Sequence, residues 1–189
     1  MVRAKKHLGQ HFLQDNQVAE QIVEFLTGFG DYQEVLEIGP GTGVLTQHLL
    51  RGPFQKIWMI DVDREATLHL KKKFPEQADQ IIHQDFLQFQ AASCFQHRFG
   101  IVGNLPYNIS SQIFFKILDI REMVPECVCM IQKEVAQRLV SPPGNRAYGI
   151  LSVFLQAFYK LEYLLEVPPE SFYPCLLYTS DAADEHRDV

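Results

Sequence analysis

The sequence predicts an α/β protein with a mostly parallel central sheet and helices on both faces. Three observations support this fold class. Short apolar runs typical of strands alternate with stretches of helical periodicity along most of the chain. A glycine-rich turn follows the first apolar run, and an acidic residue closes each of the next two. Repeated strand–helix alternation favours right-handed crossovers, which make the strands parallel and place helices on both faces.

The predicted strands are short, as expected for a buried parallel sheet. They cover residues 35–38, 57–60, 81–83, 99–102, 127–131 and 161–167.

Helices are predicted from apolar periodicity and from capping residues. The first begins at a cap, Asp15 or Asn16, and ends before Gly28. Its apolar face consists of Val18, Ile22, Phe25 and Leu26. A later helix is expected to begin at a Ser110 or Ser111 cap. The other helices are expected after residue 43, over residues 64–74, through Val135 and Leu139, and over residues 150–158.

Composition excludes several classes of protein. A chain of 189 residues with 47% hydrophobic residues can bury a core, unlike collagen-like or disordered chains. No apolar run reaches the roughly 18–20 residues of a membrane span, so no membrane association is expected. The basic N-terminus lacks an apolar signal core, and the four cysteines lack a disulfide-framework spacing. We therefore expect a cytoplasmic protein with free thiols.

The net charge of −6 does not by itself settle whether the protein binds nucleic acid. Part of this negative charge comes from residues 175–189, which contain four acidic residues and one arginine. Basic residues gather at Arg3, Lys5 and Lys6 and again at residues 71–73, where a solvated helix face is the simpler interpretation.

A glycine-rich turn at residues 37–43 lies between a predicted strand and a predicted helix, where the backbone can approach a ligand. It departs from the dinucleotide motif G-x-G-x-x-G, because Val44 replaces the third glycine and Pro40 lacks an N–H. A purely structural turn could have the same glycines.

Three carboxylates, Glu37, Asp61 and Asp85, stand at the ends of successive predicted strands, which share one edge of a parallel sheet. They would repel a pyrophosphate but suit a cationic ligand that carries a ribose and an adenine. Asp61 could accept hydrogen bonds from the ribose hydroxyls, and Asp85 from the adenine amino group. S-adenosyl-L-methionine has these features, although any one of the acids could equally be a solvated cap.

Asn104, Leu105, Pro106 and Tyr107 directly follow the fourth predicted strand. The Asn104 side-chain oxygen and the Leu105 carbonyl can accept both hydrogens of an exocyclic amine. Two such acceptors would favour a pyramidal nitrogen with an available lone pair. Pro106 stiffens the loop, and Tyr107 offers a face on which an extruded base can stack. Taken alone, the tetrapeptide could be an ordinary β-turn.

With these motifs, the chain resembles the ribosomal RNA adenine N6,N6-dimethyltransferases of the bacterial small-subunit type. The resemblance rests on residues 9–13, 37–43, 104–110, 132–136 and 147–149 and spans residues 3 to about 174. It implies a Rossmann-like class I S-adenosylmethionine-dependent methyltransferase. The cofactor-binding positions expected from it are His11, Leu13, Gly39, Gly41, Asp61, Asp85 and Asn104. His11 replaces a frequent Asn and Asp61 a frequent Glu, and both replacements keep polar acceptors.

The resemblance implies that the enzyme dimethylates N6 of two adjacent adenosines in small-subunit (16S) rRNA during ribosome biogenesis. Its expected partner is the immature small ribosomal subunit, its expected state is a monomer, and no metal is expected. Residues 104–107 are the expected catalytic set. Two alternatives remain: a large-subunit rRNA adenine N6-methyltransferase of the macrolide-resistance type, and a non-catalytic ribosome-assembly factor.

The resemblance also bears on domain organisation. Residues 1–174 are expected to be the methyltransferase domain without its last sheet strand. Family members continue with that strand and a small helical domain. Residues 175–189 fit neither, since residues 181–189 show no strand alternation and no amphipathic face, so we expect a non-native tail.

Overall fold

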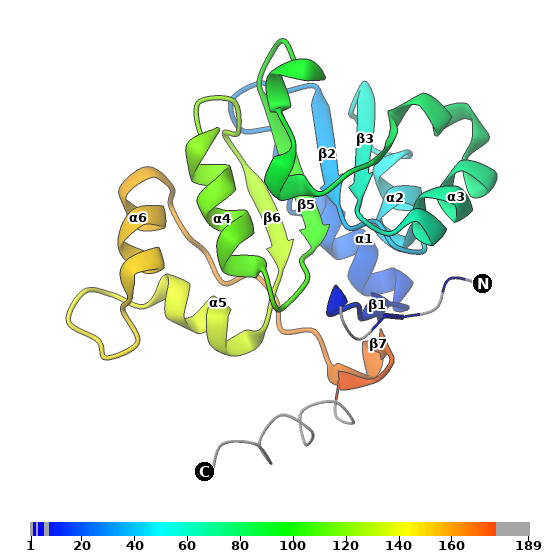
Figure 1. The fold of residues 1–189 in the computed structure, drawn as a ribbon. Coiled ribbons are helices and arrows are strands. Elements are labelled where there is room, and N and C mark those ends of the chain that lie inside the picture. Colours follow the sequence, from blue (N-terminus) through cyan, green and yellow to red (C-terminus); the bar gives the residue numbers. More distant parts are fainter. Residues whose placement is uncertain (1, 3, 6–7, 177–189) are drawn as a thin grey trace.

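The computed structural model describes residues 2, 4, 5 and 8–176. Its centre is a five-stranded sheet in the order β4-β3-β2-β5-β6, in which every pairing is parallel (Figure 1). The strands are β2 (Glu34–Ile38), β3 (Lys56–Asp61), β4 (Ile81–His83), β5 (Phe99–Asn104) and β6 (Cys127–Met130). The predicted fold class and the first five predicted strands are therefore confirmed.

Helices cover both faces of the sheet, as predicted. They are α1 (Asn16–Glu24), α2 (Val44–Leu49), α3 (Arg64–Lys73), α4 (Ser110–Asp119), α5 (Lys133–Val140) and α6 (Ile150–Phe158). On one face, α1 and α2 pack over Val35, Ile57 and Val102, while α3 packs over Met59. On the other face, α4, α5 and α6 pack over Leu36 and Ile101. This alternation of inward-facing residues follows the two-residue period of a strand.

Two helix starts show how the caps work. Asp15 caps α1 as predicted, and its carboxylate accepts hydrogen bonds from the backbone N–H groups of Gln17 and Val18. The predicted serine cap of α4 is wrong. Ile109 is the N-cap, Ser110 is the first helical residue, and the Ser110 hydroxyl donates to the Tyr107 carbonyl instead of accepting from the helix.

A second, small sheet joins the two ends of the described chain. Strand β1 (Phe12–Leu13) pairs antiparallel with β7 (Phe172–Tyr173), and the two lie side by side in Figure 1. Gln14 N–H extends the contact by donating to the Ser171 carbonyl over 2.8 Å. The N-terminal segment is thereby fixed beside the carboxyl edge of the main sheet.

The predicted strand at residues 161–167 is absent. The segment forms no strand pairing, and most of its side chains are exposed, although Lys133 and Glu166 form an ion pair. An extended segment becomes a strand only when a neighbour accepts and donates its backbone hydrogen bonds. Among the described residues, β6 is the last strand of the sheet, and no further strand stands between it and this segment to pair with residues 161–167. Of the expected tail, residues 177–189 lie outside the described part of the chain.

Candidate active site

A pocket lies at the carboxyl edge of the main sheet, where β2, β3 and β5 end. Its walls are residues 8–12, Gly39, Gly41, Asp61, Val62 and residues 104–107. The strand register brings these ends together, because Ile38 pairs with both Ile60 and Gly103. The predicted residues His11, Gly39, Gly41, Asp61 and Asn104–Tyr107 therefore meet in one place.

The glycine-rich turn is held against both neighbouring strands. Gly39 N–H donates to the Ile60 carbonyl over 2.9 Å, which continues the pairing of β2 with β3 beyond the last strand residue. Gly41 has a φ of +54°, and a Cβ there would lie 2.7 Å from the Phe12 ring. Only glycine fits such a position, because a side chain would be strained and would also displace the N-terminal segment.

Asp61 is the acidic residue that reaches the pocket. Its carboxylate is buried and accepts hydrogen bonds from the backbone N–H groups of Asp63 (2.8 Å) and Gly41 (3.3 Å). Burial raises the pKa of Asp61 to about 6, although these two hydrogen bonds oppose the shift. Each carboxylate oxygen has a second lone pair, so the group can still accept a hydroxyl of a ligand.

Glu37 lies beneath the turn and does not line the pocket. Its side chain is 1% exposed and accepts a 2.6 Å hydrogen bond from the Thr46 hydroxyl. Burial raises its pKa to about 7, against the opposing effects of the Thr46 hydrogen bond and the Lys73 charge. Lys73, for which a solvated helix face was the simpler interpretation, donates to the Thr42 carbonyl over 2.9 Å and so helps to hold the turn.

Two predicted cofactor residues lie outside the pocket walls. Asp85 follows β4, and its side chain accepts from Leu87 N–H as the cap of a short 3-10 helix. Leu13 is buried in the core beside α1, next to the pocket-lining Phe12. Their roles as ligands of a cofactor stay predictions.

Asn104 is oriented by the N-terminal segment. Its side-chain N–H donates to the His11 carbonyl over 2.6 Å, which fixes which end of the amide is nitrogen and which is oxygen. Leu105 is held from β6, because its N–H donates to the Met130 carbonyl over 3.0 Å. Within the part of the chain that the structure describes, the Asn104 side-chain oxygen and the Leu105 carbonyl accept no hydrogen bond. Both acceptors therefore remain available to a donor.

Tyr107 stands beside these acceptors with its ring half-buried. Burial raises the pKa of its phenol to about 12, so the group is neutral at physiological pH. One face of the ring is stacked against His11, for which the family resemblance predicts a role in cofactor binding. Gly9 comes close to the same loop, where an added Cβ would lie 3.0 Å from the Asn108 side-chain oxygen.

The positions of strand ends did not predict the part of the pocket wall that the N-terminal segment forms. Leu8, Gly9, Gln10 and Phe12 line the pocket, yet none belongs to the parallel sheet. The motif at residues 9–13, which supports the family resemblance, contains Gly9, Gln10 and Phe12, whereas nothing in the sequence indicated Leu8. Val62 also lines the pocket and follows directly from the position of Asp61.

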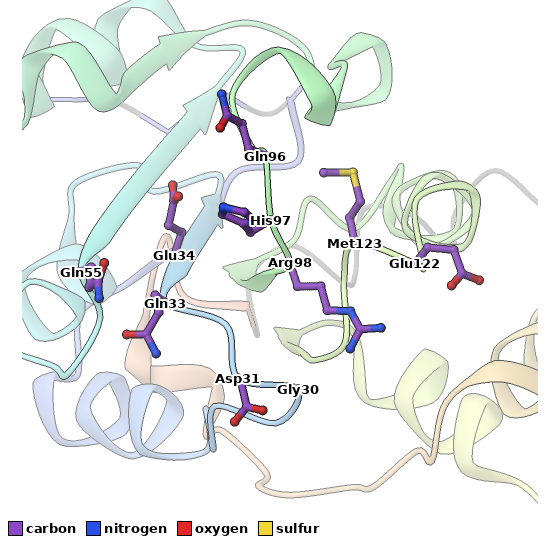
Figure 2. A pocket seen from close by; sticks show the side chains of 10 residues that line it. All are labelled: Gly30, Asp31, Gln33, Glu34, Gln55, Gln96, His97, Arg98, Glu122 and Met123. Atoms are coloured by element: carbon purple, nitrogen blue, oxygen red, sulfur yellow. The ribbon is translucent and has the colours of Figure 1, made fainter.

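A larger hollow of about 660 Å³ lies at the opposite, amino edge of the sheet (Figure 2). Its lining combines Arg98 with three carboxylates, those of Asp31, Glu34 and Glu122. None of the predicted site residues is among its lining residues. In parallel α/β sheets, ligands bind at the carboxyl edge, so the smaller pocket is the candidate active site.

The comparison with known families agrees with this geometry. A family model described as ribosomal RNA adenine dimethylase matches residues 1–176. The chain belongs to this family. A relative from Cytophaga hutchinsonii, named ribosomal RNA small subunit methyltransferase A, is 55% identical over 173 residues, which make up 92% of this chain and 67% of the relative. A relative of the same name from Porphyromonas gingivalis is 50% identical over 175 residues.

Solved structures show the same fold. A dimethyladenosine transferase from Plasmodium falciparum matches with a TM-score of 0.74 and 28% identity, over 87% of this chain and 58% of that one. The 23S rRNA methyltransferase ErmE matches with a TM-score of 0.75 and 24% identity, over 87% of this chain and 64% of that one. The fold of this family member is therefore that of the class I S-adenosylmethionine-dependent methyltransferases.

The described residues contain no group of three or more His, Cys, Asp or Glu side chains placed to hold a metal ion. None of their helices has the length and hydropathy needed to cross a membrane.

Proposed function

We propose that this chain transfers methyl groups from S-adenosyl-L-methionine to N6 of two adjacent adenosines in small-subunit (16S) rRNA, and that it acts in ribosome biogenesis. The observation that carries the proposal is the pair of available acceptors, the Asn104 side-chain oxygen and the Leu105 carbonyl, beside the ring of Tyr107. A protein that only binds RNA has no need for two acceptors directed at an amine.

The residues of the pocket fit S-adenosyl-L-methionine. Asp61 provides a buried carboxylate that can accept ribose hydroxyls and favours a cation. The turn at Gly39 and Gly41 allows the backbone to approach a ligand closely, and Asp85 stands at the end of the next strand. When bound, the cofactor supplies a methyl group on a positively charged sulfur, which makes that methyl open to attack by a nucleophile.

Asn104, Leu105 and Tyr107 act on the target base. Stacking on Tyr107 holds the extruded adenine, while in the first transfer the two acceptors bind its two N6 hydrogens. In the second transfer N6 carries one methyl group, and its one remaining hydrogen is bound by one of the acceptors. Accepting both hydrogens favours a pyramidal nitrogen and frees its lone pair from the ring. The acceleration of methyl transfer comes from the proximity and orientation of the reacting groups. The N6 proton becomes acidic once the new bond forms, so no general base is required.

The choice of small-subunit rRNA is supported by the names of the more similar relatives. Proteins named as small-subunit methyltransferases reach 55% and 50% identity, whereas the large-subunit enzyme ErmE shares 24%. The fold alone does not separate the two candidates, since the dimethyladenosine transferase and ErmE match with nearly the same TM-score. A large-subunit methyltransferase is therefore the second candidate, and a non-catalytic assembly factor the third.

Transfer of tritiated methyl groups tests the proposal directly. Wild-type protein is incubated with labelled cofactor and either immature small subunits or large-subunit RNA, with Asn104→Ala as the inactive control. We expect label on N6 of adenosines in small-subunit rRNA only. Label confined to large-subunit RNA would establish the second candidate. Binding of immature subunits without any incorporation would establish the third.

The proposal also includes the partner, the oligomeric state, the location and the domain organisation of the enzyme. The partner is the immature small ribosomal subunit, the protein acts as a monomer, and it works in the cytoplasm, where bacterial ribosomes assemble. Residues 1–174 form its catalytic domain, and residues 175–189 are a tail foreign to it. The family match ends at residue 176, two residues beyond this boundary, and so supports a division near residue 174.

A further inference from the structure

Asp63 has more bonding partners than its position requires. Its side chain is fully buried and stands two residues after Asp61, at the start of α3. One carboxylate oxygen accepts from the Lys5 ammonium at 2.5 Å and from Glu65 N–H at 2.9 Å. The other accepts from the Gln10 side-chain N–H at 3.2 Å. Its own backbone N–H donates to Asp61.

Helix capping explains only one of these bonds. Asp15 caps α1 with bonds to two backbone N–H groups, whereas Asp63 bonds a single N–H of α3 and directs the rest of its carboxylate at the N-terminal segment. Burial would raise the pKa of Asp63, but the hydrogen bonds from Lys5 and Gln10 outweigh it, and the pKa lies below its ordinary value. The carboxylate is thus ionised and tied to residues 58 and 53 positions away in sequence.

Lys5 and Gln10 are connected to the catalytic loop, residues 104–107. Lys5 and Gln10 are bonded to each other, since Lys5 N–H donates to the Gln10 side-chain oxygen over 3.0 Å. Gln10 is followed by His11, whose carbonyl accepts the Asn104 amide N–H. Two hydrogen bonds, joined by the peptide bond between Gln10 and His11, therefore connect Asp63 to Asn104. The same carboxylate is linked to Asp61 through the backbone.

We propose that Asp63 is a positioning residue for methyl transfer. It fastens the N-terminal segment to the sheet, so that the His11 carbonyl keeps the Asn104 oxygen directed at the target amine. This role rests on the proposed function, because it assigns Asn104 the amine as its ligand. Small displacements of such an acceptor are costly, since misplacement by about 1 Å can lower a rate by about 100-fold.

The variant Asp63→Asn separates positioning from capping. Its side-chain oxygen can still cap α3 through Glu65 N–H, so the fold is kept. Its amide nitrogen, however, would then face the side-chain N–H of Gln10, and the charge that holds Lys5 is gone. Asp15→Asn is the matched control, because it makes the same change at another helix cap outside the site. Lys5→Met releases the same segment from the other side and leaves the cap untouched.

The test measures single-turnover methyl transfer at saturating cofactor and RNA, together with amide hydrogen exchange over residues 8–13. We expect Asp63→Asn to slow the chemical step by at least about tenfold and Lys5→Met to slow it less. Both should exchange faster over residues 8–13, and Asp15→Asn should match wild type in both measurements. The double variant Asp63→Asn/Lys5→Met should be no slower than Asp63→Asn, because the two residues act through one contact.

Three results would overturn the inference: a wild-type rate in Asp63→Asn, unchanged exchange over residues 8–13, or an equal loss of rate in Asp15→Asn. Failure of the proposed function looks different. In that case the wild-type protein transfers no methyl group to small-subunit rRNA, whereas faster exchange in Asp63→Asn and Lys5→Met would still show that Asp63 fastens the segment. Positioning for methyl transfer would then be withdrawn together with the proposed function.

Discussion

The imidazole of His11 is stacked on the phenol ring of Tyr107, with ring centroids 5.5 Å apart and an angle of 18° between the planes. The Nδ1 atom of His11 also lies 3.1 Å from the Pro174 carbonyl oxygen, so the imidazole is fixed on both sides. His11 covers one face of Tyr107, so a target base would have to stack on the opposite face. The orientation of the Tyr107 ring is therefore set by residues from both ends of the described chain.

Tyr107→Ala should weaken capture of the target base. Stacking of a base on an aromatic side chain is worth about 1–3 kcal/mol, so the Kd for RNA should rise roughly 5- to 150-fold. Tyr107→Phe keeps the ring and serves as the control, with RNA affinity close to wild type. Equilibrium binding of a small-subunit rRNA fragment checks both. Equal losses in the two variants would show that the hydroxyl, and not stacking, is what matters.

Asn104→Ala should slow the chemical step, because it removes an acceptor that acts on the amine in the transition state. Asn104→Asp should also be slow. Its carboxylate would replace the donor that binds the His11 carbonyl with an acceptor, and two acceptors facing each other repel. Single-turnover kinetics at saturating RNA measure the step. A wild-type rate in Asn104→Ala would contradict the mechanism, and a wild-type rate in Asn104→Asp would contradict the bond to His11.

Cofactor affinity should depend on pH through Asp61. Its pKa of about 6 is raised by burial, and the ionised carboxylate is the form that accepts ribose hydroxyls and favours a cation. Affinity should thus be constant above about pH 7 and fall by up to about tenfold per unit below pH 6. Asp61→Asn should bind more weakly, with no such dependence. Calorimetric titration between pH 5 and 8 measures both, and parallel pH profiles would exclude Asp61 as the group responsible.

Asp85→Ala should weaken cofactor binding by about 1–3 kcal/mol if its carboxylate accepts the adenine amino group, since that is the cost of losing such a hydrogen bond. The same change removes the bond to Leu87 N–H, so a loss of stability is expected as well. Asp85→Asn keeps an acceptor for Leu87 and is the comparison variant. Calorimetry separates the two effects, and unchanged cofactor affinity in Asp85→Ala would refute the assignment.

Glu37 should make the protein less stable as the pH rises. Burial raises its pKa from 4.5 to about 7, so the folded state binds this proton more tightly than the unfolded state. The resulting stabilisation is complete below pH 4.5 and is lost as the pH rises through 7. Glu37→Gln removes this dependence and should raise the free energy of unfolding at pH 8 by about 3 kcal/mol. Urea unfolding at pH 5 and pH 8 measures the difference, with Glu34→Gln on the same strand as control.

Much of the site could be predicted because strand ends are a consequence of topology. Once residues 35–38, 57–60 and 99–102 are taken as parallel strands, Gly39, Asp61 and Asn104 must share an edge, and the structure places them in one pocket. The period of apolar residues and the handedness of crossovers are strong local signals.

The remaining parts depend on contacts that leave no periodic signal. Strands β1 and β7 contain two residues each, too few to show any alternation. The bonds of Asp63 to Lys5 and Gln10 join residues more than fifty positions apart, and no local pattern indicates them. The prediction of a strand at residues 161–167 was wrong although the segment does show a local signal. Its apolar pattern is favourable, but pairing needs a neighbour, which a pattern within one segment cannot supply.

The pairing of β1 with β7 has a consequence for synthesis on the ribosome. His11 and Pro174, which meet at the wall of the pocket, are 163 positions apart, so this wall closes a very long loop. A nascent chain can assemble the parallel sheet as soon as β6 has emerged, because all its strands precede residue 131. The imidazole of His11, which stacks on Tyr107, gains its contact with Pro174 only after another forty or so residues have been added. Folding of the sheet and maturation of the active site are therefore separate events in time, and a chain arrested between them would hold the parallel sheet without the competence to act.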